Sequence, residues 1–264
     1  MTLQELLKTI IKKPPVYSTG IEFLDNALDG GFEMGQLVTV TGEPDAGKTM
    51  FTEQVLSNVS RGFKCLYLSL EFNRRQAHQR FWQRVNNGTA DFDALANVEF
   101  VSTEDTDGDM GQVINIINKN IENGTRFIII DSTLMLHIEG MGGEQEITEI
   151  FRRLHALTVK NDVLLFVITQ SSKDENKEGR VGIFGSQKAS HFANIMLHLT
   201  YDKDKDERWL VISKNKQNGE YLKQKVVLSK TLLTFNTYAV EVEEAKKPQQ
   251  KGGREKKSSL WDKI

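Results

Sequence analysis

The chain has 264 residues, a formal net charge of −2, 39% hydrophobic residues, 27% charged residues and a single cysteine. No apolar run approaches the roughly 18 residues that a membrane span needs, and one cysteine excludes an internal disulfide. The first residues show no basic start followed by an apolar stretch, so we expect a cytoplasmic protein that has no membrane partner.

The charge is unevenly distributed along the chain. Residues 245–264 carry seven Lys/Arg and two Asp/Glu, which leaves residues 1–244 at −7. An acidic body excludes an overall basic field, so any contact with nucleic acid has to come from local basic loops or the tail. We expect a linker helix within 1–14, a folded core over 15–244, and a disordered basic tail over 245–264.

The predicted elements alternate regularly along the chain. Apolar residues at helical spacing over 3–12 predict an amphipathic helix that ends before Pro14. Strands and helices then follow at 36–41 (strand), 48–61 (helix), 65–70 (strand), 74–86 and 111–122 (helices), 126–130 (strand), 145–161 (helix) and 163–169 (strand). This alternation predicts an α/β fold with a mostly parallel sheet and helices on both faces. The short-spaced strands 209–213, 225–228 and 234–235 are expected to finish the sheet as an antiparallel hairpin edge.

The strongest chemical signal is a glycine-rich segment between a predicted strand and a predicted helix. Its spacing, Gly42-x4-Gly47-Lys48-Thr49, is that of a phosphate-binding loop. The glycines let backbone N–H groups converge on phosphates, Lys48 is expected to neutralise the β- and γ-oxygens, and Thr49 to bind magnesium. We therefore predict an ATP and Mg²⁺ site formed by Gly42, Glu43, Pro44, Asp45, Ala46, Gly47, Lys48, Thr49 and Met50.

Three polar residues stand at the carboxyl ends of predicted strands, on the sheet edge where α/β folds bind ligands. Asp131 follows Phe127-Ile128-Ile129-Ile130 and suits magnesium. Glu71 ends the strand that contains Ser69 and is the best candidate for the base that activates water. Gln170 follows the strand 163–169, where an amide can contact a γ-phosphate.

Two groups of cations are candidates for further contacts. Lys173, Lys177 and Arg180 lie in the loop 171–184 and are predicted to bind a DNA backbone, although acidic neighbours also fit a solvated surface loop. Lys214 and Lys216 follow the strand 209–213; by themselves, lysines on a late hairpin are usually only solvated.

Taken together, these segments resemble the RecA-like motor domain of ring-shaped replicative DNA helicases, the group of DnaB, Twinkle and the phage primase-helicases. The likeness covers about residues 15–240. It includes the strand before the P-loop, the sequence Ser69-Leu70-Glu71-Phe72, and the stretch from Gly185-Ser186-Gln187-Lys188 to Ala193-Asn194. Ser213-Lys214-Asn215-Lys216 resembles a family segment that reads Ser-Lys-Asn-Arg.

The resemblance implies that Lys214 and Lys216 reach the γ-phosphate bound by a neighbouring subunit. It also implies a homo-oligomer, a hexameric ring with single-stranded DNA in its channel, and a helix at 3–12 that docks on the adjacent subunit. From its residues alone, that helix equally fits a surface of its own domain. Here the finger position is Lys216 instead of Arg, and a lysine offers a point charge in place of a bidentate fork. Arg180 or Arg208 remain alternatives for that role.

Three functions stay open at this point. The first is an ATP-dependent DNA helicase of the replicative type, in which the tail end at Leu260 and Trp261 either recruits a replication partner or only solubilises the chain. The second is a RecA-like or RadA-like recombination ATPase that forms filaments or rings on DNA without processive unwinding. The third is a KaiC-like nucleotide-switched adaptor that binds a protein partner.

Overall fold

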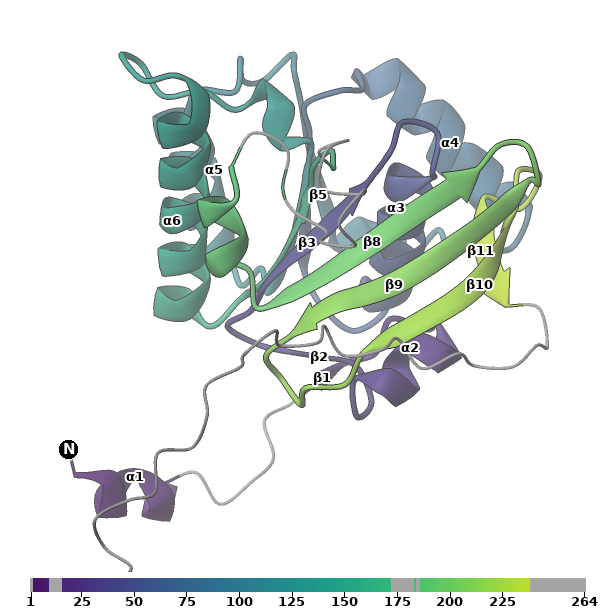
Figure 1. Cartoon of the computed structure of the whole chain (residues 1–264). Helices are drawn as coiled ribbons and strands as arrows, with labels where there is room; N and C mark the ends of the chain where they lie inside the picture. Colours follow the sequence, from purple (N-terminus) through teal and green to yellow (C-terminus); the bar gives the residue numbers. More distant parts are fainter. Residues whose placement is uncertain (1, 10–15, 172–182, 184–185, 238–264) are drawn as a thin grey trace, which may run out of the picture.

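The computed structural model describes residues 2–9, 16–171, 183 and 186–237, and its centre is a nine-stranded sheet (Figure 1). The strand order is β11-β10-β9-β8-β3-β7-β6-β4-β5. The strands are β3 (Leu37–Gly42), β4 (Cys65–Ser69), β5 (Val98–Ser102), β6 (Phe127–Asp131), β7 (Leu164–Ile168), β8 (Ile195–Asp202), β9 (Glu207–Asn215), β10 (Leu222–Ser229) and β11 (Thr234–Thr237).

The sheet has a parallel part and an antiparallel part. The pairs from β8 through β3, β7, β6 and β4 to β5 are all parallel. The strands β9, β10 and β11 then add to β8 in antiparallel fashion, as a meander. The predicted fold class is therefore confirmed, and β9, β10 and β11 correspond to the three strands expected at the antiparallel edge.

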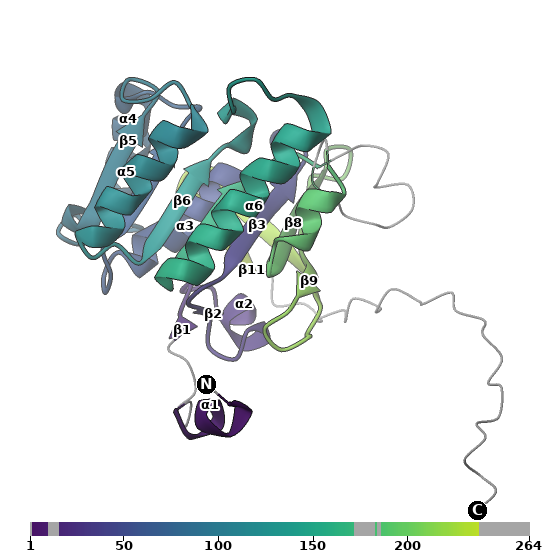
Figure 2. The ribbon, with the colours of Figure 1, turned by 90° about the vertical axis from the view of Figure 1, so that its left-hand side faces the viewer.

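Helices cover both faces of the parallel part, which is why its inner strands read as continuous apolar runs. Helices α3 (Lys48–Val59) and α4 (Arg74–Asn86) lie on one face, and α5 (Met110–Glu122) and α6 (Gly143–Asn161) on the other (Figures 1 and 2). Each face has its own buried cluster, one around Phe51 and Phe166 and the other around Ile130 and Phe151. The two cores hold the strand ends at one edge in fixed positions.

The remaining elements are short. They are α1 (Leu3–Thr9), β1 (Val16–Tyr17), α2 (Glu22–Ala27), β2 (Phe32–Glu33) and the 3-10 turns η1 (Ala94–Asn97), η2 (Thr133–Met135) and η4 (Lys188–His191). The helix predicted over 3–12 begins at Leu3, and residues 10–15 lie outside the described part, as does the predicted tail. Within the described ranges, no helix is both long enough and apolar enough to cross a membrane.

Two strands of the sheet, β5 and β8, were absent from the sequence-based prediction. In β8 the apolar run is interrupted by His198, whose ring is buried and lies with Nδ1 2.9 Å from the Thr41 hydroxyl oxygen. In β5 only the last two residues are buried, so its pattern is weak. Strand β8 matters for the site because it pairs with β3 up to Gly42, where the P-loop begins.

Candidate functional site: a pocket around the P-loop

The P-loop connects β3 to α3 and requires its two glycines for steric reasons. Gly42 and Gly47 have φ angles of 153° and 97°, a region that disfavours side chains. A Cβ on Gly42 would lie 2.3 Å from the carbonyl oxygen of Leu199, and one on Gly47 would lie 2.7 Å from Cζ of Phe235. Gly47 caps α3 without a side-chain hydrogen bond, so the N–H groups of that helix end are available for an anion.

Lys48 begins α3 and folds back over the loop. Its ammonium donates hydrogen bonds to the carbonyl oxygens of Gly42, at 3.0 Å, and of Glu43, at 2.8 Å. Burial lowers the pKa of Lys48, while the nearby carboxylates of Glu71 and Asp131 oppose that shift. A phosphate on the loop offers this ammonium a full negative charge in place of two neutral carbonyls.

Asp131 is the buried carboxylate of the site. Its Oδ2 accepts a hydrogen bond from the Tyr67 hydroxyl at 3.2 Å, and its Oδ1 has no hydrogen-bond partner in the described part of the chain. Burial raises the pKa of Asp131 to about 7, and Glu71 adds to the shift, while the hydroxyls of Thr49 and Tyr67 lower it. A buried carboxylate oxygen without a partner, beside a threonine hydroxyl, fits a hard cation such as Mg²⁺.

Glu71 lies two residues beyond the end of β4 and borders the same cavity. Its Oε1 accepts a hydrogen bond from the Ser132 hydroxyl at 2.6 Å, which ties the loop after β4 to the loop after β6. The carboxylate itself is exposed, so water can reach it. Gln170, two residues beyond the end of β7, is half-buried and borders the same pocket.

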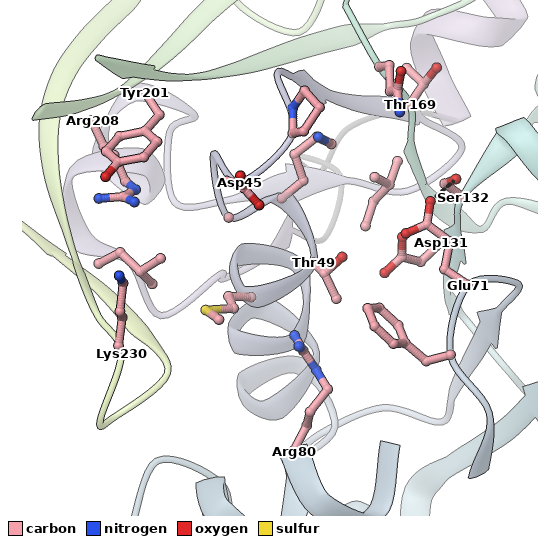
Figure 3. A pocket seen from close by; sticks show the side chains of 18 of the residues that line it. Asp45, Thr49, Glu71, Arg80, Asp131, Ser132, Thr169, Tyr201, Arg208 and Lys230 are labelled. Carbon is pink, nitrogen blue, oxygen red and sulfur yellow. Dashed lines mark hydrogen bonds between the residues drawn. The ribbon is translucent and has the colours of Figure 1, made fainter. Parts of the chain in front are cut away.

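These residues line a single cavity of about 740 Å³, within the range of roughly 300–1,000 Å³ that is usual for small-molecule sites. Figure 3 shows Glu71, Asp131 and Ser132 at one end of it and Tyr201, Arg208 and Lys230 at the other. Thr49 lies between the two ends (Figure 3). The sequence-predicted residues that line the cavity are Pro44, Asp45, Gly47, Lys48, Thr49, Met50, Glu71, Asp131 and Gln170.

The far end of the cavity consists of residues that the sequence analysis did not assign to the ATP site. The guanidinium carbon of Arg208 lies 3.5 Å from the centre of the Tyr201 ring, and Lys203 forms a 3.2 Å ion pair with Asp45 of the P-loop. Only the parallel pairing of β8 with β3 brings Tyr201 to this edge, so its position could have been predicted only by recognising β8. Arg80 of α4 also lines the cavity, and no local sequence signal distinguishes it.

Lys214 and Lys216 are not in this pocket. Their ammonium groups donate to carbonyl oxygens of η4, Lys214 to Ser190 at 2.6 Å and Lys216 to His191 at 3.1 Å. The backbone of Lys216 bonds to Asn194, next to the start of β3. The length of β3, about 17 Å at 3.3 Å per residue, separates that edge from the P-loop (Figure 1).

The remaining predicted cations lie elsewhere in the chain. Arg208, one of the two alternatives for the finger role, lines the cavity at the P-loop of its own chain, and Arg180, the other, lies outside the described residues. Lys173, Lys177 and Arg180, the predicted DNA-binding cations, lie outside the described residues.

Comparison with known proteins agrees with this architecture. The family described as ATPase: KaiC matches residues 17–226. The DNA repair protein RadA of Aquifex aeolicus is 24% identical over 204 residues, covering 75% of this chain and 41% of that protein. The DNA repair protein RAD51 homolog 4 of Bos taurus is 24% identical over 193 residues, covering 66% and 57% respectively. The chain thus spans less than two thirds of the length of either relative.

Solved structures show the same fold. One solved ATPase domain has a TM-score of 0.71 at 17% identity, and the match covers 89% of this chain and 96% of that domain. The KaiC-like protein PH0186 of Pyrococcus horikoshii has a TM-score of 0.67 at 18% identity, with coverage of 86% and 100%. A DnaB-like replicative helicase, solved to study its interactions with primase, has 0.71 at 18%, with coverage of 89% and 66%. With the family match over residues 17–226, the chain belongs to the KaiC family of ATPases and has their RecA-like P-loop fold.

Proposed function

We propose that this chain is an ATP-dependent DNA helicase motor, which couples ATP hydrolysis to movement along single-stranded DNA. The observation that carries the hydrolytic part is the pocket itself, which is lined by the P-loop, Asp131 and the exposed Glu71; in the described part of the chain, one Asp131 oxygen has no hydrogen-bond partner. A switch that only binds nucleotide has no need for a carboxylate placed to activate water.

Each of the predicted site residues in the pocket has a separate role in the proposed hydrolysis. Lys48 and the P-loop N–H groups hold the phosphates, and Thr49 with Asp131 holds magnesium, which when bound neutralises charge on the phosphate oxygens. Glu71 accepts a proton from a water that attacks the γ-phosphorus; the bond from phosphorus to the bridging oxygen breaks, and ADP and phosphate leave. Gln170 contacts the γ-phosphate and registers its loss.

The end of the cavity opposite Glu71 and Asp131 suits the nucleobase of ATP. The buried guanidinium of Arg208 stacks on one face of the half-buried Tyr201 ring, and that ring offers a stacking surface, as aromatic side chains do for bases in general. Lys203 and Lys230 border this end and add positive charge. The cavity thus provides for both parts of a nucleoside triphosphate.

The positions of Lys214 and Lys216 support the proposal of an oligomer. Because Lys214 and Lys216 lie at the edge of the sheet opposite their own P-loop, they act on a nucleotide only if it belongs to a neighbouring copy. A head-to-tail arrangement of copies meets this condition and closes into a ring when its rotation allows. We propose a homo-oligomeric ring, as the helicase resemblance implies, with a hexamer as the expected size.

The DNA part of the proposal has separate support. The motifs from Gly185 to Asn194 and from Ser213 to Lys216 resemble those of replicative helicases, and the fold of a DnaB-like replicative helicase matches most of this chain. The loop 171–184 directly follows Gln170, so a change at the γ-phosphate is one residue away from the loop that carries the predicted DNA contacts. That spacing is suited to coupling hydrolysis with DNA movement.

A second candidate is a recombination ATPase that orders DNA in a filament or ring without processive unwinding. The observation that favours it is the sequence likeness to the repair proteins RadA and RAD51 homolog 4. A KaiC-like adaptor, favoured by the family match, keeps the nucleotide site but has no DNA response.

The test compares ATP hydrolysis with and without single-stranded DNA, and unwinding of a forked duplex in the same samples. Glu71→Gln is the test variant, and Glu122→Gln, at an exposed site on α5, is its matched control. We expect DNA-stimulated hydrolysis and strand separation, both lost in Glu71→Gln only. Stimulation without unwinding supports the recombination ATPase, and hydrolysis indifferent to DNA supports the adaptor.

A further inference from the structure

A buried cluster of charges lies beneath the nucleotide pocket and has no part in the roles assigned so far. Glu53 of α3 is 1% exposed, and its carboxylate accepts hydrogen bonds from two arginines of α4. Arg80 donates to both carboxylate oxygens, at 2.6 and 2.9 Å, and Arg84 donates to Oε2 at 3.3 and 3.2 Å. Arg84 also donates to the carbonyl oxygen of Met50, in the first turn of α3.

Arg80 differs from Arg84 in what else it contacts. Arg84 is completely buried, whereas the side chain of Arg80 is 21% exposed and borders the nucleotide pocket. Figure 3 shows Arg80 reaching from α4 toward the α3 turn that carries Thr49. The guanidinium carbon of Arg80 lies 5.0 Å from the centre of the Phe72 ring. Phe72 directly follows Glu71, the proposed catalytic base. Arg80 therefore contacts both the Glu71-Phe72 segment and helix α3, which follows the P-loop.

Stability alone is a weak explanation for this cluster. Taking charges out of water costs several kcal/mol per ion, and apolar replacements of buried ion pairs are often neutral or stabilising. The cluster also carries one positive charge in excess and leaves Nη1 of Arg84 without a partner in the described part of the chain. What the cluster does supply is a rigid, directional link between α3 and the second half of α4.

We propose that Arg80 is a positioning residue of the ATPase reaction, which holds the Glu71-Phe72 segment at a fixed separation from the P-loop helix. It does so through a bidentate bond to Glu53 on one side and the Phe72 ring on the other. The inference rests on the proposed function, because it assigns Arg80 a role that operates through Glu71. It requires no direct contact between Arg80 and ATP.

The first test is Arg80→Ala, measured by steady-state ATP hydrolysis. Glu53 keeps its bonds to Arg84 in this variant, so the carboxylate stays paired and the fold should persist, which circular dichroism checks. Loss of alignment at the reacting atoms should lower kcat about tenfold or more while KM changes less than about twofold. Arg80→Lys should recover only part of the rate, since lysine lacks the bidentate fork.

The matched control is Arg75→Ala, on an exposed position of the same helix, which should keep the wild-type kcat. A rise in KM at unchanged kcat in Arg80→Ala overturns the positioning role in favour of direct contact with ATP. An unchanged kcat and KM overturns it outright.

A double-mutant cycle tests the route through Glu71. In single-turnover hydrolysis, Arg80→Ala added to Glu71→Gln should cause little further loss, because the base it positions is already absent. Fully multiplicative losses would mean that Arg80 acts independently of Glu71 and would overturn the inference, while the proposed function stands. If the wild-type chain hydrolyses no ATP, the proposed function fails first and the inference falls with it.

Discussion

At the P-loop edge of the sheet, Asp131 is buried beside an open cavity, and one of its carboxylate oxygens has no partner among the described residues. At the opposite edge, the ammonium groups of Lys214 and Lys216 already bind carbonyls of their own chain. The first edge is ready to receive a ligand. The second must exchange existing hydrogen bonds for new ones, and does so only if a partner offers a stronger acceptor, such as a phosphate. We infer that one chain holds a complete binding site and an incomplete catalytic one.

The largest expected effect comes from the P-loop edge. Lys48→Ala removes the cation that neutralises the phosphate oxygens, so we expect ATP hydrolysis to fall at least about 100-fold. Lys119→Ala, at an exposed position on α5, is the matched control and should keep the wild-type rate. If Lys48→Ala keeps a rate within about tenfold of wild type, ATP hydrolysis does not depend on the P-loop edge, and the contrast between the two edges is wrong.

The edge of the sheet that carries Lys214 and Lys216 should affect the pH dependence of ATP hydrolysis. Burial lowers the pKa of Lys214 to about 8, with a further contribution from Lys216. A lysine with this pKa loses its charge as the pH rises through about 8, so kcat/KM for ATP should decline above that pH. Lys214→Arg keeps its charge throughout. We expect the decline to move to higher pH in that variant; an identical profile would remove Lys214 from the reaction.

At the P-loop edge, the end of the cavity proposed for the nucleobase should affect ATP binding more than the rate of hydrolysis. Tyr201→Ala removes a stacking surface that is typically worth about 1–3 kcal/mol, so KM for ATP should rise roughly tenfold with kcat nearly unchanged. Tyr221→Ala, outside the pocket lining, serves as the control. A fall in kcat at constant KM would contradict the division of the cavity into a base end and a phosphate end.

The smallest expected effect is on the free energy of unfolding. It tests whether burial of the Asp131 carboxylate at the P-loop edge destabilises the folded chain. Because the pKa of Asp131 is raised to about 7, the folded protein binds that proton more tightly than the unfolded chain does. Its contribution to stability is therefore lost as the pH rises from about 4 to about 7, and stays lost above. Asp131→Asn removes the buried charge.

We expect Asp131→Asn to raise the free energy of unfolding at about pH 8 by about 1–2 kcal/mol in urea titrations with EDTA. The gain should shrink at about pH 5, where the wild-type carboxyl is protonated in the folded state. The variant should also lose any stabilisation by magnesium with nucleotide. Equal stability of both proteins at the higher pH would show that the carboxylate is not strained by burial.

How much of the site was predictable depends on how local each signal is. Gly42, Gly47 and Lys48 form a contiguous motif, and Glu71, Asp131 and Gln170 follow recognisable apolar strands, so both groups could be predicted to share one edge. The structure places all but Gly42 among the residues that line the cavity, and Gly42 binds Lys48 through its carbonyl.

The other half of the cavity depends on non-local pairing. Tyr201 reaches the pocket through the register of β8 on β3, and β8 was missed because His198 interrupts its apolar run. Arg80 reaches it through the packing of α4 on α3, where its partner Glu53 is 27 residues away in sequence. Neither relationship has a signature within a short window of sequence, so packing had to reveal them.

The most direct test of the central claim, that two chains complete one catalytic site, is a mixing experiment. Lys48→Ala chains lack a working P-loop but keep Lys216, and Lys216→Ala chains keep the P-loop but lack the finger. We predict that each variant alone hydrolyses ATP poorly, and that subunit exchange in an equal mixture restores activity at roughly a quarter of the interfaces. A mixture that never exceeds the sum of the two separate rates, or a Lys216→Ala protein with the full wild-type rate, would contradict the account.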